Sequence, residues 1–235
     1  MKRLCTINAR GGSKGVKDKN IREINGIPLI AYSIIQAKKS GLFDSIAVSS
    51  DSDLILKIAK EYGAEYLIKR PEELATDTAS KLTAIKHCVL ETERLSQQTY
   101  DIIVDLDATS PLREIKDIVE AIKLLEEKKV SNVITGMSSR RSPYFNLVEL
   151  NEEGFVELAK KLPTEIIRRQ DAPKTYDMNA SIYVWIRESL LENNLLFHPD
   201  TLLYEMPEER SFDIDSELDF QIVEFIMLKR GKENG

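Results

Sequence analysis

The stretch LCTINARGGSKGVKDKN, from Leu4 to Asn20, joins a short apolar run to a loop that holds three glycines, one arginine and three lysines. The apolar run predicts a first strand, and a helical pattern follows the loop. The loop fits neither the G-x-G-x-x-G dinucleotide fingerprint nor the Walker A sequence. Its backbone N–H groups, together with Arg10 and Lys14, can still bind phosphates at the start of a helix. We expect a phosphate-binding loop here; a flexible turn whose lysines are only solvated is the alternative.

The overall composition is that of an ordinary globular protein. The chain has 235 residues, of which 42% are hydrophobic and 31% charged, enough to form one full core with a smaller appendage. A net charge of −6 argues against a nucleic-acid or membrane partner, so the basic loop is a local exception that suggests an anionic ligand. We expect a cytoplasmic protein, because the chain shows no signal-peptide pattern and no apolar run near the ~20 residues of a membrane helix.

Apolar periodicity alternates between strand and helix patterns along the chain. The expected strands are 45–50, 64–70, 101–108, 132–138 and 180–186, and the expected helices are 28–41, 54–63, 81–95 and 114–128. Asp51 or Asp53 is the expected cap of the second helix. Repeated strand-helix-strand units predict an α/β fold with a mostly parallel sheet, whose ligands bind beyond the carboxyl ends of the strands. The pattern breaks between Ser139 and Tyr176, and insertions of that length are usually functional or contact a partner.

Acidic D-x-D pairs occur three times, at Asp51 and Asp53, Asp105 and Asp107, and Asp213 and Asp215. Two carboxylates with this spacing face the same way on an extended chain and could share one Mg²⁺. Helix capping accounts for the first pair. The second pair ends a central strand, at the ligand edge of the sheet. The third pair precedes the last helix. Ser216 can cap that helix, which leaves the two carboxylates of the pair without a capping role. We therefore expect Asp213 and Asp215 to bind the metal.

The histidines and cysteines form no catalytic constellation. His87 and His198 lack partners at metal or triad spacing, and Cys5 and Cys88 form neither a disulfide framework nor a metal site. We therefore expect the cysteines to be small core residues and the histidines to be structural or surface residues.

A series of motifs in fixed order covers nearly the whole chain. They are ARGGSKGVKDKNI, NGIPLIAYSI, VSSDS, RPEELATDTAS, TSPLR, RRQDAPKTYDMNASIYVW and FDIDSELDF. The series resembles the acylneuraminate cytidylyltransferases, or CMP-nonulosonate synthetases. The resemblance implies a Rossmann-like nucleotidyltransferase core over 1–138 and 176–235, with a small dimerisation arm over 139–175 that reaches the partner's active site in a homodimer. It also implies that CTP and a nine-carbon 2-keto sugar acid react to give a CMP-sugar and pyrophosphate.

The resemblance also assigns roles to single residues. It implies that the nucleotide loop consists of Arg10, Gly11, Ser13, Lys14 and Asn20, and that the cytosine and ribose are contacted by Arg70, Ala79 and Ser80. It implies that Mg²⁺, or alternatively Mn²⁺, is bound by Asp213 and Asp215. The implied sugar pocket contains Arg169 and Asn179. Arg10 and Lys14 would neutralise the charge that builds as pyrophosphate leaves. The metal or Asp215 would help to remove the proton from the attacking anomeric hydroxyl.

Several positions depart from the sialic-acid enzymes of this family. Asp107, in LDATSPLR, stands where those enzymes have a glutamine that faces the sugar. Asp177 replaces a common arginine, and Phe145 replaces a lysine of the arm. The LDATSPLR form resembles the legionaminic acid branch, whose 5,7-diamino sugars carry a second nitrogen. We therefore expect N,N′-diacetyllegionaminic acid as substrate, with Asp107 at the sugar; N-acetylneuraminate is the alternative.

Three further alternatives remain open at the level of the sequence. A 3-deoxy-manno-octulosonate cytidylyltransferase shares the chemistry, but its basic loop is usually shorter. A metal-dependent D-x-D glycosyltransferase would use Asp105 and Asp107 as its working carboxylates. A non-catalytic nucleotide sensor would have lost the metal pair, whereas Asp213 and Asp215 are both present.

Overall fold

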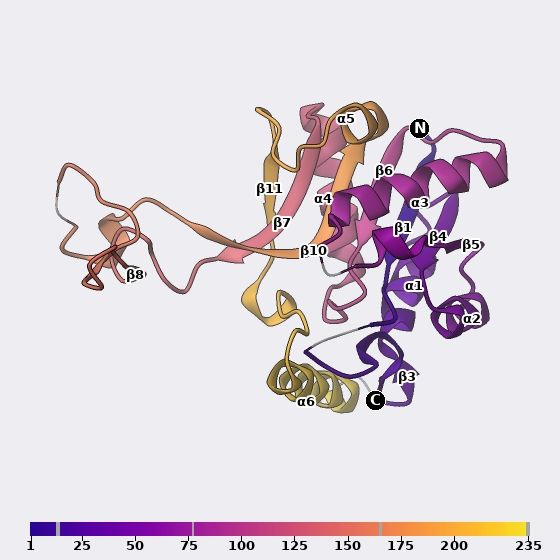
Figure 1. The fold of residues 1–235 in the computed structure, drawn as a ribbon, viewed down its shortest axis with the longest axis horizontal. Helices are drawn as coiled ribbons and strands as arrows, with labels where there is room; N and C mark the ends of the chain where they lie inside the picture. The colour runs from indigo at the N-terminus through magenta and orange to yellow at the C-terminus, as the bar shows by residue number, and fades with distance from the viewer. Residues whose placement is uncertain (13–14, 77, 165, 234–235) are drawn as a thin grey trace.

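The computed structural model describes residues 1–12, 15–76, 78–164 and 166–233. Its main sheet has seven strands in the order β11-β7-β10-β6-β1-β4-β5 (Figure 1). These strands are β1 (Arg3–Asn8), β4 (Ser45–Ser50), β5 (Tyr66–Lys69), β6 (Ile102–Leu106), β7 (Asn132–Ser138), β10 (Tyr176–Ile186) and β11 (Leu202–Glu205). Within this sheet β10 runs antiparallel to both of its neighbours, and the other pairings are parallel. The expected mostly parallel sheet is confirmed.

Helices cover both faces of the sheet. They are α1 (Leu29–Ser40), α2 (Asp53–Tyr62), α3 (Lys81–Ser96), α4 (Ile115–Lys128), α5 (Arg187–Glu192) and α6 (Glu217–Glu233). Apolar side chains of α1, α2 and α4 share one buried cluster with the sheet, and those of α3 and α5 share a second cluster on the other face. No helix among the described residues is long and apolar enough to cross a bilayer.

A smaller cluster joins α6 to the last part of the basic loop and the segment that follows it. That segment contains η1 (Lys19–Ile21) and the short pair β2 (Glu23–Ile24) and β3 (Ile27–Pro28). Val16 and Ile24 pack there with Ile214, Phe220 and Val223. Residues from the two ends of the chain therefore share one core beneath the ligand edge of the sheet (Figure 1).

The cap of α2 differs from the expectation. Ser52 is the N-cap, and its Oγ accepts a hydrogen bond from Ile55 N at 3.5 Å. Asp53 is instead in the first helical turn, where it pairs with Lys69 at 2.6 Å. The prediction that Asp51 or Asp53 caps α2 was therefore wrong, because the serine between them takes that position and frees Asp51 for another contact.

The strand order defines where a ligand can enter. From β1 the chain proceeds outward to β4 and β5, then returns to β6 on the other side of β1. The order therefore reverses between β1 and β6, and ligands of open α/β sheets bind at such a switch point, outside the carboxyl ends of the strands. Asn8 ends β1 and Asp107 directly follows β6, so both lie at this edge.

The segment 139–175 leaves the sheet as a projecting arm between the end of β7 and the start of β10 (Figure 1). It contains the hairpin of β8 (Val148–Leu150) and β9 (Val156–Leu158) and the short helix η3 (Arg169–Asp171). Several apolar side chains on it are exposed, Ile167 by 82% and Leu150 by 70%. The arm's role in dimerisation stays a prediction.

Candidate active site

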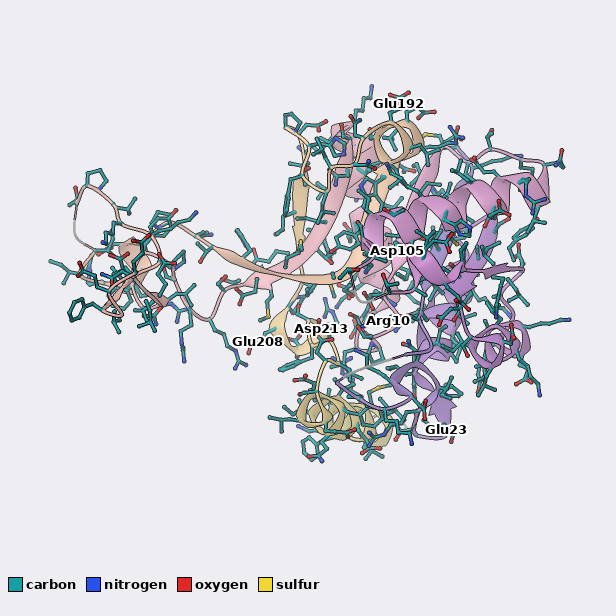
Figure 2. All side chains as sticks on the ribbon, in the orientation of Figure 1. Arg10, Glu23, Asp105, Glu192, Glu208 and Asp213 are labelled. Atoms are coloured by element: carbon teal, nitrogen blue, oxygen red, sulfur yellow. The ribbon has the colours of Figure 1, made fainter. Side chains whose placement is uncertain are left out.

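A cavity of about 240 Å³ lies at the switch point. Its lining comes from the ends of β1 and β5, the start of α3 and the turn after β6, namely Asn8, Arg10, Arg70, Leu74, Thr76, Ala79, Ser80, Lys81, Ala84 and Asp107. In Figure 2, Arg10, Asp105 and Asp213 project onto the same central region between the sheet and α6. The structure thus brings Arg10, Arg70, Ala79, Ser80 and Asp107 to one cavity, although three separate motifs supply them.

Arg70 is held rigidly in the cavity wall. It is 7% exposed, and its Nη2 donates to Asn8 Oδ1 at 2.8 Å and to Ser49 O at 3.0 Å. Burial lowers the pKa of the Arg70 guanidinium, but arginine remains charged at neutral pH. A fixed guanidinium at this edge can donate several hydrogen bonds to a nucleotide.

The basic loop is anchored at both of its ends. Gly11 N donates to Asp51 Oδ1 at 2.8 Å, and Asn20 Nδ2 donates to the carbonyl oxygen of Arg10 at 2.9 Å. Asn20 is 7% exposed, so this bond closes the loop from inside. Ser13 and Lys14 lie outside the described residues, so their predicted roles rest on the sequence alone.

The loop packs directly against the late acidic segment. A Cβ on Gly15 would overlap the carbonyl oxygen of Asp215. Lys19 Nζ donates to the carbonyl oxygen of Ile214 and lies 3.1 Å from Asp215 Oδ1. The basic loop and the third D-x-D pair therefore form one structural unit, and Lys19 and Gly15 are residues that join them.

Asp213 and Asp215 flank a buried residue. Ile214 is fully buried, and its N–H donates to the carbonyl oxygen of Thr109 at 3.1 Å, which ties this segment to the turn after β6. Burial and the negative charges of Asp215 and Asp107 raise the pKa of Asp213. A cation would relieve this repulsion. Among the described residues no group of three or more metal-binding side chains exists, so an ion here would need further ligands.

Asp105 is buried at the end of β6. Its Oδ1 accepts hydrogen bonds from Thr6 Oγ1 and Asn8 Nδ2, both at 2.8 Å. Its Oδ2 accepts none from the described residues, but Lys81 Nζ lies 3.4 Å away, within ion-pair distance. Asp105 therefore joins β1, β6 and α3 below the cavity.

Asp107 uses both of its oxygens within the protein. Oδ2 lies 2.6 Å from Lys81 Nζ, and Oδ1 accepts from the N–H and Oγ1 of Thr109 at 2.9 and 2.8 Å. Burial opposes the charged form, but the attraction of Lys81 and these hydrogen bonds lower the pKa of Asp107 to about 2. Lys81 occupies the place that a metal would take between Asp105 and Asp107, which argues against the D-x-D glycosyltransferase alternative.

The low pKa of Asp107 predicts an acid-sensitive contribution to stability. The ordinary value is 3.8, so the ionised form stabilises the fold above about pH 4, and the contribution is lost as pH falls toward about 2. A shift of this size corresponds to roughly 2 kcal/mol. The free energy of unfolding from urea titrations at pH 5.5 and 2.5 should fall less in Asp107→Asn than in the wild type. Equal losses in the two proteins would contradict the assignment.

Arg113, the last residue of TSPLR, positions the turn that carries Asp107. It is buried, and it donates from Nη1 to the carbonyl oxygen of Ser181 at 2.6 Å and from Nη2 to Ser33 Oγ at 2.7 Å. Burial lowers the pKa of the Arg113 guanidinium to about 10, so it stays charged at neutral pH. Sequence reasoning assigned no role to this residue.

A second cavity, of about 210 Å³, adjoins the first. Its lining is Ser80, Lys81, Leu82, Ile85, Tyr183, Trp185, Asn194 and Leu196, so the two cavities share Ser80 and Lys81. Lys81 Nζ lies 4.9 Å from the centre of the Tyr183 ring. Sequence analysis did not find this cavity. The available signal was Lys81 itself, a charged residue directly after the motif RPEELATDTAS.

The two remaining sugar-pocket candidates lie outside the two cavities at the switch point. Arg169, on the arm, donates to the carbonyl oxygen of Ser139 at 2.8 Å and lines a separate cavity there. Asn179 is 6% exposed, and its Oδ1 accepts from Thr135 Oγ1 at 2.7 Å. Neither residue lines the two cavities at the switch point. Their contacts with a sugar stay predictions.

Comparison with solved structures supports the fold. A structure of CMP:2-keto-3-deoxy-manno-octonic acid synthetase complexed with CTP superposes with a TM-score of 0.70 at 15% identity, covering 98% of this chain and all of the other. The 4-diphosphocytidyl-2C-methyl-D-erythritol synthase of Anaerococcus prevotii gives a TM-score of 0.63 at 12% identity, covering 97% and 98%. At these identities the likeness concerns the architecture alone.

Sequence comparison defines the family. The chain is 50% identical to the CMP-N,N′-diacetyllegionaminic acid synthase of Campylobacter jejuni, over 95% of this chain and 94% of the relative. It is 48% identical to the post-translational flagellin modification protein B of Campylobacter coli, over 97% and 95%. An N-acylneuraminate cytidylyltransferase of Escherichia coli is 32% identical, over 98% of this chain and 53% of the relative. Since the cytidylyltransferase family profile also matches residues 4–230, the chain belongs to the cytidylyltransferase family of nucleotidyltransferases.

Proposed function

We propose that this enzyme transfers CMP from CTP to N,N′-diacetyllegionaminic acid, or to a related 5,7-diamino nonulosonate, and releases pyrophosphate. The observation that carries the proposal is the pair of adjoining cavities at the switch point, one lined in part by Arg10 and Arg70 and the other by apolar side chains together with Ser80, Lys81 and Asn194. A nucleotide and a sugar acid in these two cavities would meet at Ser80 and Lys81. The relative at 50% identity, named for this sugar, supports the same substrate.

The proposed reaction is a direct displacement at the α-phosphorus of CTP. The anomeric hydroxyl of the sugar acid forms the new oxygen–phosphorus bond, and the bond to the bridging oxygen of pyrophosphate breaks. Asp215, whose side chain is 78% exposed, is suited to accept the hydroxyl proton. Arg10, on the basic loop, neutralises the charge that builds on pyrophosphate. Lys14 is proposed for the same role from the sequence alone.

We propose that Asp213 and Asp215 hold Mg²⁺ when CTP is bound; Mn²⁺, which accepts the same oxygen ligands, is the alternative. The donor set fits, because magnesium in nucleotide enzymes is usually bound by one or two carboxylates together with substrate phosphates. The mutual repulsion that raises the pKa of Asp213 also favours a cation beside the pair. The metal would polarise the α-phosphate and neutralise its charge.

The substrate assignment is tested by pyrophosphate release with CTP and Mg²⁺, using N,N′-diacetyllegionaminic acid and N-acetylneuraminic acid at equal concentrations. We expect kcat/KM to be at least about tenfold higher for the diacetamido sugar, which corresponds to ~1.4 kcal/mol in the transition state. A preference for N-acetylneuraminic acid would instead support a CMP-sialate synthetase.

We propose that the arm forms a homodimer interface. Its exposed apolar side chains, among them Leu150, Phe155, Val156 and Ile167, would be covered by a second copy. We expect Phe155→Asp/Val156→Asp to shift the protein from dimer to monomer in light scattering and to lower turnover, because Arg169 would act in the partner's site. Leu54→Asp, at a 51% exposed position on α2, is the control and should leave the dimer intact. A wild type that is monomeric at full turnover would contradict the interface.

A further inference from the structure

Lys81 forms part of the wall between the two cavities. It is the first residue of α3 and lines both of them. Its side chain is 37% exposed, whereas that of Asp107 is 20% exposed. A ligand in either cavity can therefore contact the Lys81 ammonium group, which sequence analysis did not single out.

The ammonium group is held in place before any ligand binds. Lys81 Nζ lies 2.6 Å from Asp107 Oδ2 and 3.4 Å from Asp105 Oδ2, and it is also close to the Tyr183 ring. An ammonium has three N–H donors, and the described residues accept one of them as a hydrogen bond, at Asp107. Lys81 therefore has donor capacity left for a ligand, at a position that its carboxylate partners define.

Asp107 is less suited to contact the sugar itself. Both of its oxygens already accept hydrogen bonds, from Lys81 on one side and from Thr109 on the other. Three of its roughly four acceptor positions are therefore taken, and at most one is left for a donor from the substrate. At the place where the sequence predicted a sugar-binding carboxylate, the lysine that it anchors thus has more hydrogen-bonding capacity left.

The charge of this cluster limits what it can bind. Asp105 and Asp107 interact electrostatically with Lys81 and also with the buried guanidinium group of Arg113. The charge of Lys81 is already balanced by Asp107 at 2.6 Å, so an uncharged carbonyl oxygen can accept from its remaining donors at little cost. Tyr183, Trp185 and Leu196 form an apolar wall beside it, which suits the methyl group of an acetyl substituent.

We propose that Lys81, positioned by Asp107, is a specificity residue that donates a hydrogen bond to the carbonyl oxygen of the second acylamino group of the sugar. This inference rests on the proposed function. N-acetylneuraminic acid carries only one acylamino group, so it would leave this donor unpaired in a partly buried site. Such an unpaired polar group lowers transition-state binding of the wrong substrate.

The test compares Lys81→Met with the wild type on both sugars, measuring kcat and KM for each sugar and for CTP by pyrophosphate release. We expect KM for N,N′-diacetyllegionaminic acid to rise at least about tenfold, KM for CTP to change less than about threefold, and the preference over N-acetylneuraminic acid to fall to about one. Lys81→Arg, which keeps a cationic donor, should retain part of the preference. Lys123→Met, at an exposed lysine of α4, is the control and should match the wild type.

Each other outcome has a defined meaning. Equal losses of kcat/KM for both sugars in Lys81→Met, with the preference kept, would show that Lys81 has a structural role and would overturn the inference. A wild type that shows no preference between the two sugars would also overturn it. If Lys81→Met does not fold, Asp107→Asn decides, because it keeps the lysine but removes the negative charge that holds it in place: the preference should fall at least about threefold, and an unchanged preference overturns the inference. A wild type that uses no nonulosonate would instead refute the proposed function.

Discussion

Replacing Asp213 by asparagine should lower kcat/KM about a thousandfold while leaving the fold at least as stable as the wild type. The amide removes one of the two negative charges proposed to hold Mg²⁺, and a loss of this size corresponds to ~4 kcal/mol of transition-state stabilisation. The stability follows from the pKa of Asp213, which burial and the charges of Asp215 and Asp107 raise. The ionised carboxyl group therefore costs folding free energy at neutral pH, and the neutral amide does not.

Pyrophosphate release and thermal unfolding measure the two effects separately. Asp53→Asn is the matched control, since Asp53 also belongs to a D-x-D pair but is 88% exposed on α2, and it should keep turnover within about twofold of the wild type. Excess chelator should abolish turnover of the wild type. If Asp213→Asn retained more than a tenth of the wild-type kcat/KM, the proposed metal pair would be wrong.

Substituting alanine for Gly15 should lower kcat/KM at least about a hundredfold, or ~3 kcal/mol. The new Cβ would overlap the carbonyl oxygen of Asp215, which is backbone and cannot rotate away as a side chain could. The loop or the acidic segment would have to shift, and this would separate the groups proposed to bind the triphosphate from the proposed metal ligands. Displacements of this kind at a reacting centre reduce rates steeply.

Gly12→Ala provides the matched control in the same loop, because no atom of the described residues, apart from its chain neighbours, would lie within 4 Å of a Cβ at Gly12. We expect its kcat/KM to stay within about threefold of the wild type, and its free energy of unfolding to be unchanged. Gly15→Ala should lose about 1–3 kcal/mol of that free energy through overpacking. Equal kinetic losses in the two variants would mean that flexibility of the loop, and not its contact with Asp215, limits activity.

The direction of β10 shows how far the sequence could predict the sheet. Apolar periodicity predicted most strands of the main sheet, though not β11, and most helices, because each of these elements buries an apolar face that its own residues define. The reversed direction of β10 depends instead on segment 139–175, whose described residues contain no crossover helix. Parallel neighbours need a connection that returns to the other end of the sheet, whereas β7 ends and β10 begins at the same end.

The sequence singled out cavity residues that lie within a single motif. It missed the contacts between residues that are far apart in the chain. Arg70 and Ser80 belong to quoted motifs and do line the cavity with Arg10. Asp51 was interpreted as a helix cap, yet it accepts a hydrogen bond from Gly11, 40 residues earlier. Lys81 pairs with Asp107, 26 residues later. No local pattern encodes such contacts, because they arise only when the sheet brings neighbouring strand ends together.

The most direct test of the central claim is product formation by the wild type with CTP, Mg²⁺ and N,N′-diacetyllegionaminic acid, followed by mass spectrometry together with a pyrophosphate assay. We expect the CMP-sugar and pyrophosphate to appear in equal amounts, and neither to form when the sugar is omitted. Release of CDP and phosphate, or no CMP-sugar with any nonulosonic acid offered, would contradict it.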